Sequence, residues 1–285
     1  MKNPASVSIL CFVLGASSSV FLLLKFISEN LYLGYLSRLN YILPINYLFL
    51  NFAIHALTRK FLCQVGVRAA FLGFIFCLGI YVAALADETW DIFGWYLCCM
   101  AFFHYSEFLT IALTNPDSLS ISSFILNHST EYKVAAVSSW IEFFVELWIY
   151  PGMKTIRYVS LFGLLLCVCG EGLRKVAMIT AKTNFNHIVQ DERKEGHSLV
   201  TTGVYSLFRH PSYVGWFYWS IGTQLILLNP ICIVAYTLAS WKFFHDRVTI
   251  EEVTLLSFFG QAYVDYQKTV PTGLPFINGY TLNDE

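Results

Sequence analysis

Two short polar stretches carry most of the groups that could do chemistry. The first is Arg209-His210-Pro211-Ser212-Tyr213, which opens an uncharged, aromatic-rich run. Proline suits the first turn of a helix, where the free N–H groups carry partial positive charge. With the Arg209 and His210 side chains added, this donor-rich helix start is suited to binding a carboxylate or a phosphate.

Tyrosines flank this helix start. Tyr205 and Tyr213 offer aromatic faces and hydroxyl groups that suit a planar or cationic ligand. An ordinary alternative is that Arg209 only marks a membrane interface and that the tyrosines belong to an interfacial aromatic belt. This stretch alone leaves both interpretations open.

The second stretch places Arg247 and Glu251 four positions apart, so that they share one face of a helix. A surface ion pair is the usual result of this spacing. The flanks are nevertheless apolar: Phe243, Phe244, Leu255, Leu256, Phe258 and Phe259. A guanidinium in apolar surroundings is a good receptor for a ligand carboxylate, because it can bind both oxygens at once.

Several common sites have no signal in this chain. It contains no GxGxxG, P-loop, HExxH or GxSxG motif. Its eight cysteines fall mostly within apolar runs and form no CxxC pair, so they read as small buried apolar residues. We therefore expect no soluble Rossmann-type nucleotide site, no covalent nucleophile and no metal.

The elements that position the polar stretches are strongly apolar. Of the 285 residues, 56% are hydrophobic and only 13% are charged, against about 25% charged in soluble domains. The net charge of −1 gives no reason to expect nucleic acid as a partner. The composition instead predicts an integral membrane protein, with the lipid bilayer as its surroundings.

Eight apolar runs approach the roughly 20 residues that a membrane-spanning helix needs. We therefore expect an all-α membrane protein of about eight spans, at residues 5–24, 39–57, 69–86, 92–113, 134–150, 158–178, 211–228 and 231–244. The first run could also be a signal peptide, since small residues follow its core. However, the apolar pattern resumes at Val20 and continues to Ile27.

Asn229-Pro230 separates the last two runs and could be a kink or the turn of a hairpin. One continuous helix through both runs would be too long for an apolar core of about 30 Å, which favours the hairpin. A hairpin returns the chain to the side that it left. Both polar stretches would then emerge at the same membrane face and could build one site.

Eight spans place both termini on one side of the membrane. In this arrangement 14 of the 18 Lys and Arg residues lie on that side, so the positive-inside rule puts the termini and the site in the cytosol. We divide the chain into membrane helices one to six, residues 1–179, and a catalytic region, residues 180–285. The catalytic region holds a cytosolic loop, the hairpin and a C-terminal helix, within one structural unit overall.

Four ionisable residues lie inside the expected spans, where charge is costly and often functional. The ordinary interpretation of Glu142 and Glu146 is a position near an interface or pairing between helices. His104 and Glu107 could form structural hydrogen bonds or line a site. The sequence leaves all four roles open.

The segments RHPSYVGWFYWSIGTQLILLNP and FFHDRVTIEEVTLLSFFGQAYVDYQKTVPTGLPFI resemble the isoprenylcysteine carboxyl methyltransferases, which are integral membrane enzymes of the endoplasmic reticulum. The resemblance is strong over residues 190–277, and span count and hydropathy extend it over the chain. The shared elements are Arg209-His210-Pro211-x-Tyr213, Asn229-Pro230, Arg247, Glu251-Glu252 and Phe259-Gly260-x-x-Tyr263.

This resemblance implies an enzyme that transfers a methyl group from S-adenosylmethionine and releases S-adenosylhomocysteine. The acceptor would be the C-terminal α-carboxylate of a farnesylated or geranylgeranylated cysteine in processed CaaX proteins such as small GTPases. The enzyme would be a multi-pass protein of the endoplasmic reticulum membrane. Its termini and active site would face the cytosol.

The resemblance also implies residue roles. Arg247 and Glu251 would be catalytic, with Arg247 holding the substrate carboxylate. Glu252 and Arg209 match features of the family without an assigned contact. The implied cofactor contacts are Gln190, His197, Ser198, Leu199, Val200, Tyr205, His210, Pro211, Ser212, Tyr213 and Glu251.

Other functions remain as alternatives, because phospholipid methyltransferases and sterol reductases of the same superfamily share similar Arg-His-Pro and Glu-Glu patterns. A sterol reductase using NADPH would need basic residues for a 2′-phosphate, and no added basic cluster is present. Phospholipid methylation would favour a general base over a carboxylate-binding Arg. A transporter or receptor would spread polar residues along the spans, whereas here they gather at one end.

Overall fold

The computed structural model describes residues 3–126, 129–190, 192–193 and 195–281. Helices dominate, and no β-strand occurs among these described residues. The expected all-α class is therefore confirmed. The chain forms two compact units, Met1–Ala112 with Ser120–Leu126 and Leu113–Leu119 with Asn127–Glu285. The predicted division at residue 179 was drawn between membrane helices and catalytic residues, whereas the two units are defined by packing within the fold. The predicted division therefore stays a prediction.

The first unit is built from helices that pack through glycine. Gly15 and Gly73 lie where the first and fourth helices meet, and a Cβ on either would overlap the backbone of the other helix. The described elements of this unit are α1 (Pro4–Ala16), η1 (Ser17–Phe26), α2 (Glu29–Leu36), α3 (Leu39–Leu57), α4 (Lys60–Leu85), most of α5 (Asp91–Thr114) and η3 (Ile121–Phe124).

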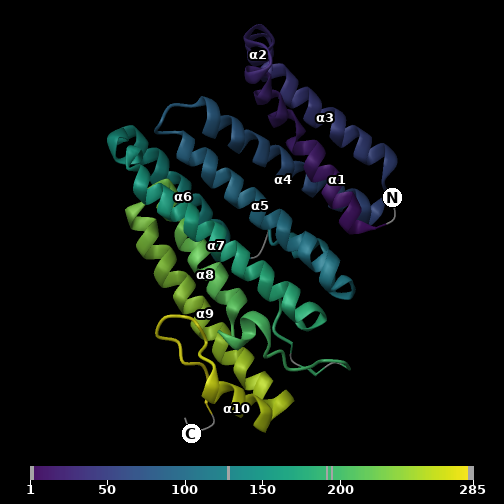
Figure 1. Cartoon of the computed structure of the whole chain (residues 1–285), viewed down its shortest axis with the longest axis vertical. Helices are drawn as coiled ribbons and strands as arrows, with labels where there is room; N and C mark the ends of the chain where they lie inside the picture. Colours follow the sequence, from purple (N-terminus) through teal and green to yellow (C-terminus); the bar gives the residue numbers. More distant parts are fainter. Residues whose placement is uncertain (1–2, 127–128, 191, 194, 282–285) are drawn as a thin grey trace. The chain divides into compact units, whose positions relative to one another are not determined.

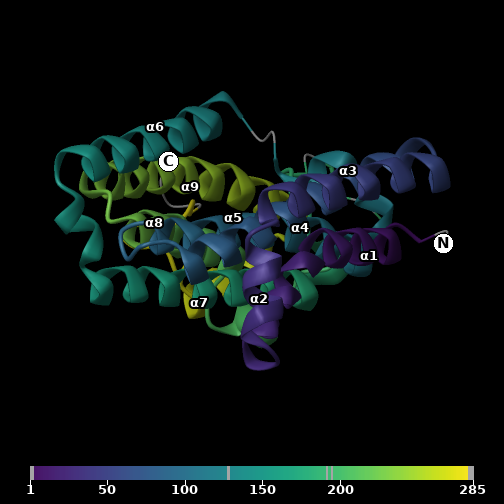
Figure 2. The same cartoon turned by 90° about the horizontal axis from the view of Figure 1, so that it is seen from above.

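The second unit contains the site. Helices α7, α8 and α9 run side by side (Figure 1), and α6 lies along α9 (Figure 2). Its described elements are η2 (Pro116–Ser118), α6 (Thr130–Ile149), η4 (Pro151–Thr155), α7 (Arg157–Ala181), η5 (Lys182–Asn184), η6 (Gly203–Ser206), α8 (Pro211–Leu227), α9 (Pro230–Phe259) and α10 (Gln261–Thr269).

Three helical segments in the described part of the chain are long and apolar enough to cross a membrane: Pro4–Phe26, which joins α1 to η1, then α4 and α5. Helix α8 has 17 residues, and α6, α7 and α9 each carry three or more charged residues. The count of eight spans therefore stays a prediction.

Helices α7 and α8 pack closely because glycines face each other. A Cβ on Gly170 would lie 2.9 Å from the amide nitrogen of Trp219, and one on Gly215 would lie 2.8 Å from that of Arg174. Small residues at such positions let two helix backbones approach. This packing holds the start of α8, and hence the first polar stretch, firmly against the end of α7.

The predicted hairpin is confirmed. Helix α8 ends at Leu227, Leu228 adopts a left-handed conformation, and α9 begins at Pro230. The expected end of the last apolar helix at residue 244 is wrong, because α9 continues without a break to Phe259 and only Gly260, at φ +53°, ends it. At about 1.5 Å per residue, the 30-residue helix is longer than an apolar core of about 30 Å.

A second boundary also differs from the prediction. Helix α4 begins at Lys60, before the apolar run expected from residue 69. Gln64 and Arg68 interrupt the apolar pattern, but both are good helix formers, so the helix includes them.

Buried charge holds the turn end of the hairpin. The Lys154 ammonium group is fully buried. It donates to Glu146 Oε2 at 2.6 Å and to the carbonyl oxygens of Leu227 and Leu228 at 2.9 and 3.0 Å. It also donates to Asn229 Oδ1 at 3.1 Å. Lys154 therefore ties α6 to the end of α8.

Glu142 holds the other side of the same turn. Its two carboxylate oxygens accept the backbone N–H groups of Ile231 and Cys232, each at 2.7 Å. The ordinary interpretation of Glu142 and Glu146 as helix-pairing residues is thus confirmed. In the first unit, the buried His104 shares a hydrogen bond of 3.0 Å with the Phe124 carbonyl oxygen, which favours a structural role.

Candidate active site

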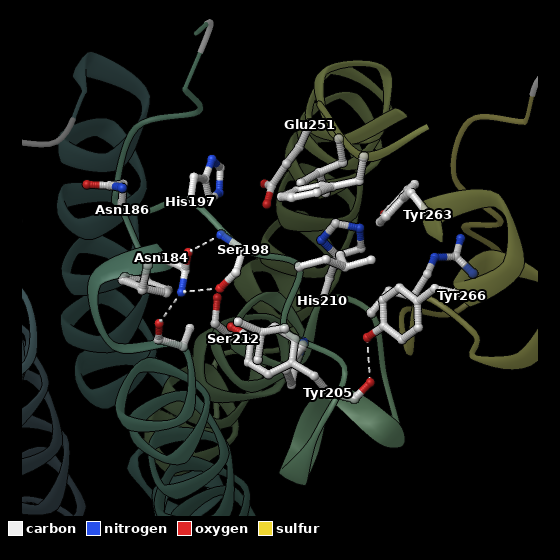
Figure 3. A pocket seen from close by; sticks show the side chains of 18 of the residues that line it. Asn184, Asn186, His197, Ser198, Tyr205, His210, Ser212, Glu251, Tyr263 and Tyr266 are labelled. Carbon is white, nitrogen blue, oxygen red and sulfur yellow. Dashed lines mark hydrogen bonds between the residues drawn. The ribbon is translucent and has the colours of Figure 1, made fainter. Parts of the chain in front are cut away.

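Three parts of the second unit surround one cavity: the linker from α7 to α8, the start of α8, and the far half of α9 with α10 (Figure 3). The cavity measures about 650 Å³ when the open space at its mouth is included. Small-molecule sites commonly fall between about 300 and 1,000 Å³. The hairpin thus brings both polar stretches to one place, as expected.

Most of the residues predicted to contact a cofactor lie in its wall. They are His197, Ser198, Leu199, Val200, Tyr205, His210, Pro211, Ser212, Tyr213 and Glu251. Gln190 does not line the cavity, and its side-chain amide instead donates to the Ile188 carbonyl oxygen at 3.0 Å. Arg247 lies behind the wall, one helical turn before Glu251.

Nine further residues line the cavity without having been predicted to do so: Ala181, Asn184, Phe185, Asn186, Arg209, Leu255, Phe259, Tyr263 and Tyr266. Asn184 closes one side, since its Oδ1 accepts the Ser198 N–H at 2.9 Å (Figure 3). The tail motif offered a signal for Phe259 and Tyr263. No sequence feature marked residues 184–186, because nothing in the pattern shows that the chain folds back after α7.

Tyr213 links Arg247 to Glu251. Arg247 Nε donates to the Tyr213 hydroxyl oxygen at 3.0 Å, and this hydroxyl donates to Glu251 Oε2. Arg247 Nη2 also donates to the His187 carbonyl oxygen at 2.5 Å. Within the described residues no direct ion pair joins Arg247 to Glu251, so the expectation of an ordinary surface pair is wrong.

Glu252 is fully buried behind the cavity and fixes several of its wall residues. Its Oε1 accepts Arg209 Nε at 2.8 Å and the Tyr263 hydroxyl at 3.0 Å, and it lies 3.0 Å from His210 Nε2. The His210 ring stacks on the Tyr213 ring with centroids 5.5 Å apart. Arg209 is therefore a buried structural cation, so its role goes beyond marking a membrane interface.

The C-terminal tail closes around the same pair. Arg209 Nη1 donates to the Val270 carbonyl oxygen at 2.5 Å and Nη2 to that of Asn278 at 2.8 Å. Glu252 Oε2 accepts the Tyr280 N–H at 2.8 Å. One buried ion pair thus joins the start of α8, α9 and the tail.

The protonation states in this region follow from these contacts. Burial raises the pKa of Glu252, but hydrogen bonds and positive charge from His210 and Arg209 outweigh it and hold that pKa at about 2. Burial raises the pKa of Tyr266 to about 12, and it also raises the pKa of Tyr205. At neutral pH Glu252 is an anion, and both tyrosine hydroxyls keep their protons.

The start of α8 keeps donors for a ligand. The Ser212 N–H lies in the first turn and has no acceptor within the described part of the chain. The Ser212 side chain lines the cavity, as does the Glu251 carboxylate (Figure 3). Such a cavity presents donors to an anionic group and a carboxylate to a cationic one. No group of three or more His, Cys, Asp or Glu residues is placed to hold a metal ion in the residues described.

Comparisons with known proteins identify the family of the chain. The model of the isoprenylcysteine carboxyl methyltransferase (ICMT) family matches residues 163–257, which include α8 and most of α9. A solved structure of the eukaryotic intramembrane Ras methyltransferase ICMT has a TM-score of 0.87 and 49% sequence identity. That match covers 99% of this chain and 100% of the solved chain.

Curated relatives match over most of their length. The protein-S-isoprenylcysteine O-methyltransferase of Xenopus laevis is 53% identical over 99% of this chain and 98% of its own length. The protein of that name from Homo sapiens is 54% identical over 82% of each chain. Similarity of this extent shows that the chain belongs to the isoprenylcysteine carboxyl methyltransferase family.

Proposed function

We propose that this O-methyltransferase transfers a methyl group from S-adenosylmethionine to the C-terminal α-carboxylate of a prenylated cysteine. The observation that carries the proposal is the connected arrangement of three residues: Tyr213 and Glu251 line the cavity, and Arg247 reaches it through its hydrogen bond to the Tyr213 hydroxyl. It places a cation suited to a carboxylate beside a carboxylate suited to a cationic methyl donor.

The residues of the cavity fit S-adenosylmethionine. Its α-carboxylate would meet the Ser212 N–H and hydroxyl at the start of α8, where the helix dipole favours an anion. Glu251 supplies a negative charge for its ammonium or sulfonium group. Tyr205 and Phe259 supply aromatic walls for its adenine ring. When bound, S-adenosylmethionine supplies an electrophilic methyl group.

The chain itself needs no general base for this reaction. An α-carboxyl group has a pKa of about 3.5 and is already ionised at neutral pH. Arg247 binds this carboxylate, removes part of its hydration and orients one oxygen toward the cavity. A positioned cation also releases the product readily, because the methyl ester is neutral.

The membrane setting suits a substrate with two parts. A prenyl chain partitions into lipid with about 0.8 kcal/mol per buried CH₂, while the cofactor is water-soluble. We therefore place the site at the cytosolic face of the endoplasmic reticulum membrane, at the cytosolic ends of about eight membrane-spanning helices. An apolar lateral opening would admit the prenyl chain. The protein substrates would be processed CaaX proteins such as small GTPases.

A methylation assay tests this function. Purified protein should transfer labelled methyl from S-adenosylmethionine to N-acetyl-S-farnesylcysteine, and it should not methylate the matching carboxamide, which lacks the acceptor oxygen. Transfer to the carboxamide, or the oxidation of NADPH with a sterol in place of methyl transfer, would contradict the proposal.

A further inference from the structure

We infer that the Tyr213 hydroxyl couples the two halves of the site, so that a ligand bound at Glu251 strengthens the hold of Arg247 on a carboxylate. This inference rests on the proposed function. In this inference the Tyr213 hydroxyl positions Arg247, while the Tyr213 ring forms part of the cavity wall.

The contacts form a directed chain. Arg247 Nε donates to the Tyr213 oxygen at 3.0 Å, and the Tyr213 hydroxyl donates to Glu251 Oε2. A tyrosine hydroxyl has a single proton, so this proton is committed to Glu251 while a lone pair is committed to Arg247. Hydrogen bonds in such a chain polarise one another, so that a change at one end is felt at the other.

The middle of this chain is rigid. The Tyr213 side chain is buried, and its ring stacks on His210 at 5.5 Å and on Phe244 at 5.2 Å between centroids. Glu252 in turn bonds to His210. Because the ring cannot turn away, its hydroxyl stays fixed, and the adjustable groups are the side chains of Arg247 and Glu251.

Arg247 has one further fixed contact. Its Nη2 donates to the His187 carbonyl oxygen at 2.5 Å, while Nη1 has no hydrogen-bond partner among the described residues. Tyr213 and His187 therefore orient the guanidinium and leave the Nη1 end to meet a carboxylate.

Electrostatics gives the sign of the coupling. In the absence of ligands, the Glu251 carboxylate lies one helical turn from Arg247 and repels a second carboxylate arriving there. A cationic ligand at Glu251 offsets this charge, and the attraction of Arg247 for the substrate carboxylate increases. By thermodynamic reciprocity, the substrate carboxylate must then strengthen binding of the cavity ligand by the same factor.

Calorimetry measures this factor directly. The Kd of S-adenosylhomocysteine, which shares the ammonium group but cannot react, is determined with and without saturating N-acetyl-S-farnesylcysteine. For the unaltered protein we expect the farnesylcysteine to lower this Kd at least about fivefold. In Tyr213→Phe, which keeps the ring and loses only the hydroxyl, the ratio should fall by about half or more, because the hydrogen-bonded link is lost and only the direct effect of the Glu251 charge remains.

A matched control lies on the same helix. Tyr218→Phe removes the hydroxyl of a partly exposed tyrosine outside the cavity wall and should keep the unaltered ratio. A second variant tests the sign. Glu251→Gln removes the repelling charge and should bind N-acetyl-S-farnesylcysteine alone more tightly than the unaltered protein does.

The outcomes separate this inference from the function on which it rests. An unaltered protein that methylates the farnesylcysteine but shows a ratio of one overturns the coupling alone. An unaltered ratio in Tyr213→Phe, or weaker binding of the farnesylcysteine by Glu251→Gln, does the same. A protein that binds neither ligand overturns the proposed function and the coupling together.

Discussion

The two ends of the α8–α9 hairpin both contain buried charge, but only one end leaves groups open to a ligand. At the turn end, the Lys154 ammonium has four protein acceptors and Glu142 accepts two backbone amides. At the open end, Glu251 and Ser212 face a cavity. Charge that is satisfied within the chain fixes structure, while charge that faces a cavity can bind and orient a ligand.

Glu252 shows that the two kinds of charge can be neighbours. It lies beside Glu251 in the sequence, yet it is fully buried among protein donors as Lys154 is. A position near a cavity therefore does not identify a ligand-binding carboxylate. What distinguishes Glu251 is that its wall position leaves it accessible to a ligand.

The largest expected effect is on stability at the turn end. Lys154→Met should lower the free energy of unfolding by about 3–5 kcal/mol, because the partly buried Glu146 carboxylate loses its cation and the buried Leu227 and Leu228 carbonyl oxygens lose their donor. Thermal unfolding in detergent measures this loss. The Lys154→Met, Glu146→Gln double variant should lose less than the sum of the two single variants. A strictly additive double variant would show that the pair is not coupled.

Acid should weaken the closed network at the open end. The Glu252 pKa of about 2 lies below its ordinary value of 4.5, so its ionised form stabilises the fold above pH 4.5 and this stability is lost as the pH falls toward 2. The full difference is about 3 kcal/mol. Unfolding measured from pH 6 downward should show a loss that Glu252→Gln lacks. Equal pH profiles for the two proteins would contradict this assignment.

Arg247→Ala tests the ligand-facing charge. It should lower kcat/KM for N-acetyl-S-farnesylcysteine about a hundredfold, since a charged hydrogen-bonding partner of the substrate is removed. Its thermal stability should change little by comparison with Lys154→Met. The control is Lys242→Ala, which removes an exposed cation from the same helix and should keep its activity. Unchanged turnover in Arg247→Ala would rule out the substrate role given to this residue.

The smallest expected effect is a loss of stability that distinguishes Glu142 from Lys154, the two residues that hold the turn. Glu142→Gln should cost about 1 kcal/mol of stability, because an amide side chain still accepts a backbone N–H but no longer carries charge at the start of α9. Chemical denaturation is sensitive enough to measure it. A loss as large as that of Lys154→Met would mean that Glu142 and Lys154 act as one unit.

Much of this arrangement could be predicted from the sequence, since local features carry it. Asn229-Pro230 marks the hairpin, and the hairpin by itself requires the two polar stretches to meet. Helix boundaries were less predictable at α4 and α9, where polar residues such as Gln64 and Asp246 interrupt the apolar pattern without breaking the helix. Hydropathy shows where the surroundings of a chain change from apolar to polar, and a single helix can continue across that change.

The contacts that depend on tertiary structure could not be predicted. Spacing suggested a direct Arg247–Glu251 pair, but Tyr213 from another helix takes the position between them. Asn184 reaches the cavity wall because the linker after α7 folds back, and no local pattern encodes that return. Hydrophobic periodicity therefore does not show which residues from distant parts of the chain face each other.

A single unbroken α9 has a consequence for how the protein responds to its surroundings. The apolar first half and the half that bears Arg247 and Glu251 belong to one rigid rod without a hinge. With the predicted span in the first half of α9, a vertical shift or tilt of that rod in a thicker or thinner bilayer would move these two side chains by a corresponding amount relative to the lipid headgroups. Acyl-chain length would then affect the methylation reaction itself, because it would set how far a lipid-anchored acid must rise to reach Arg247.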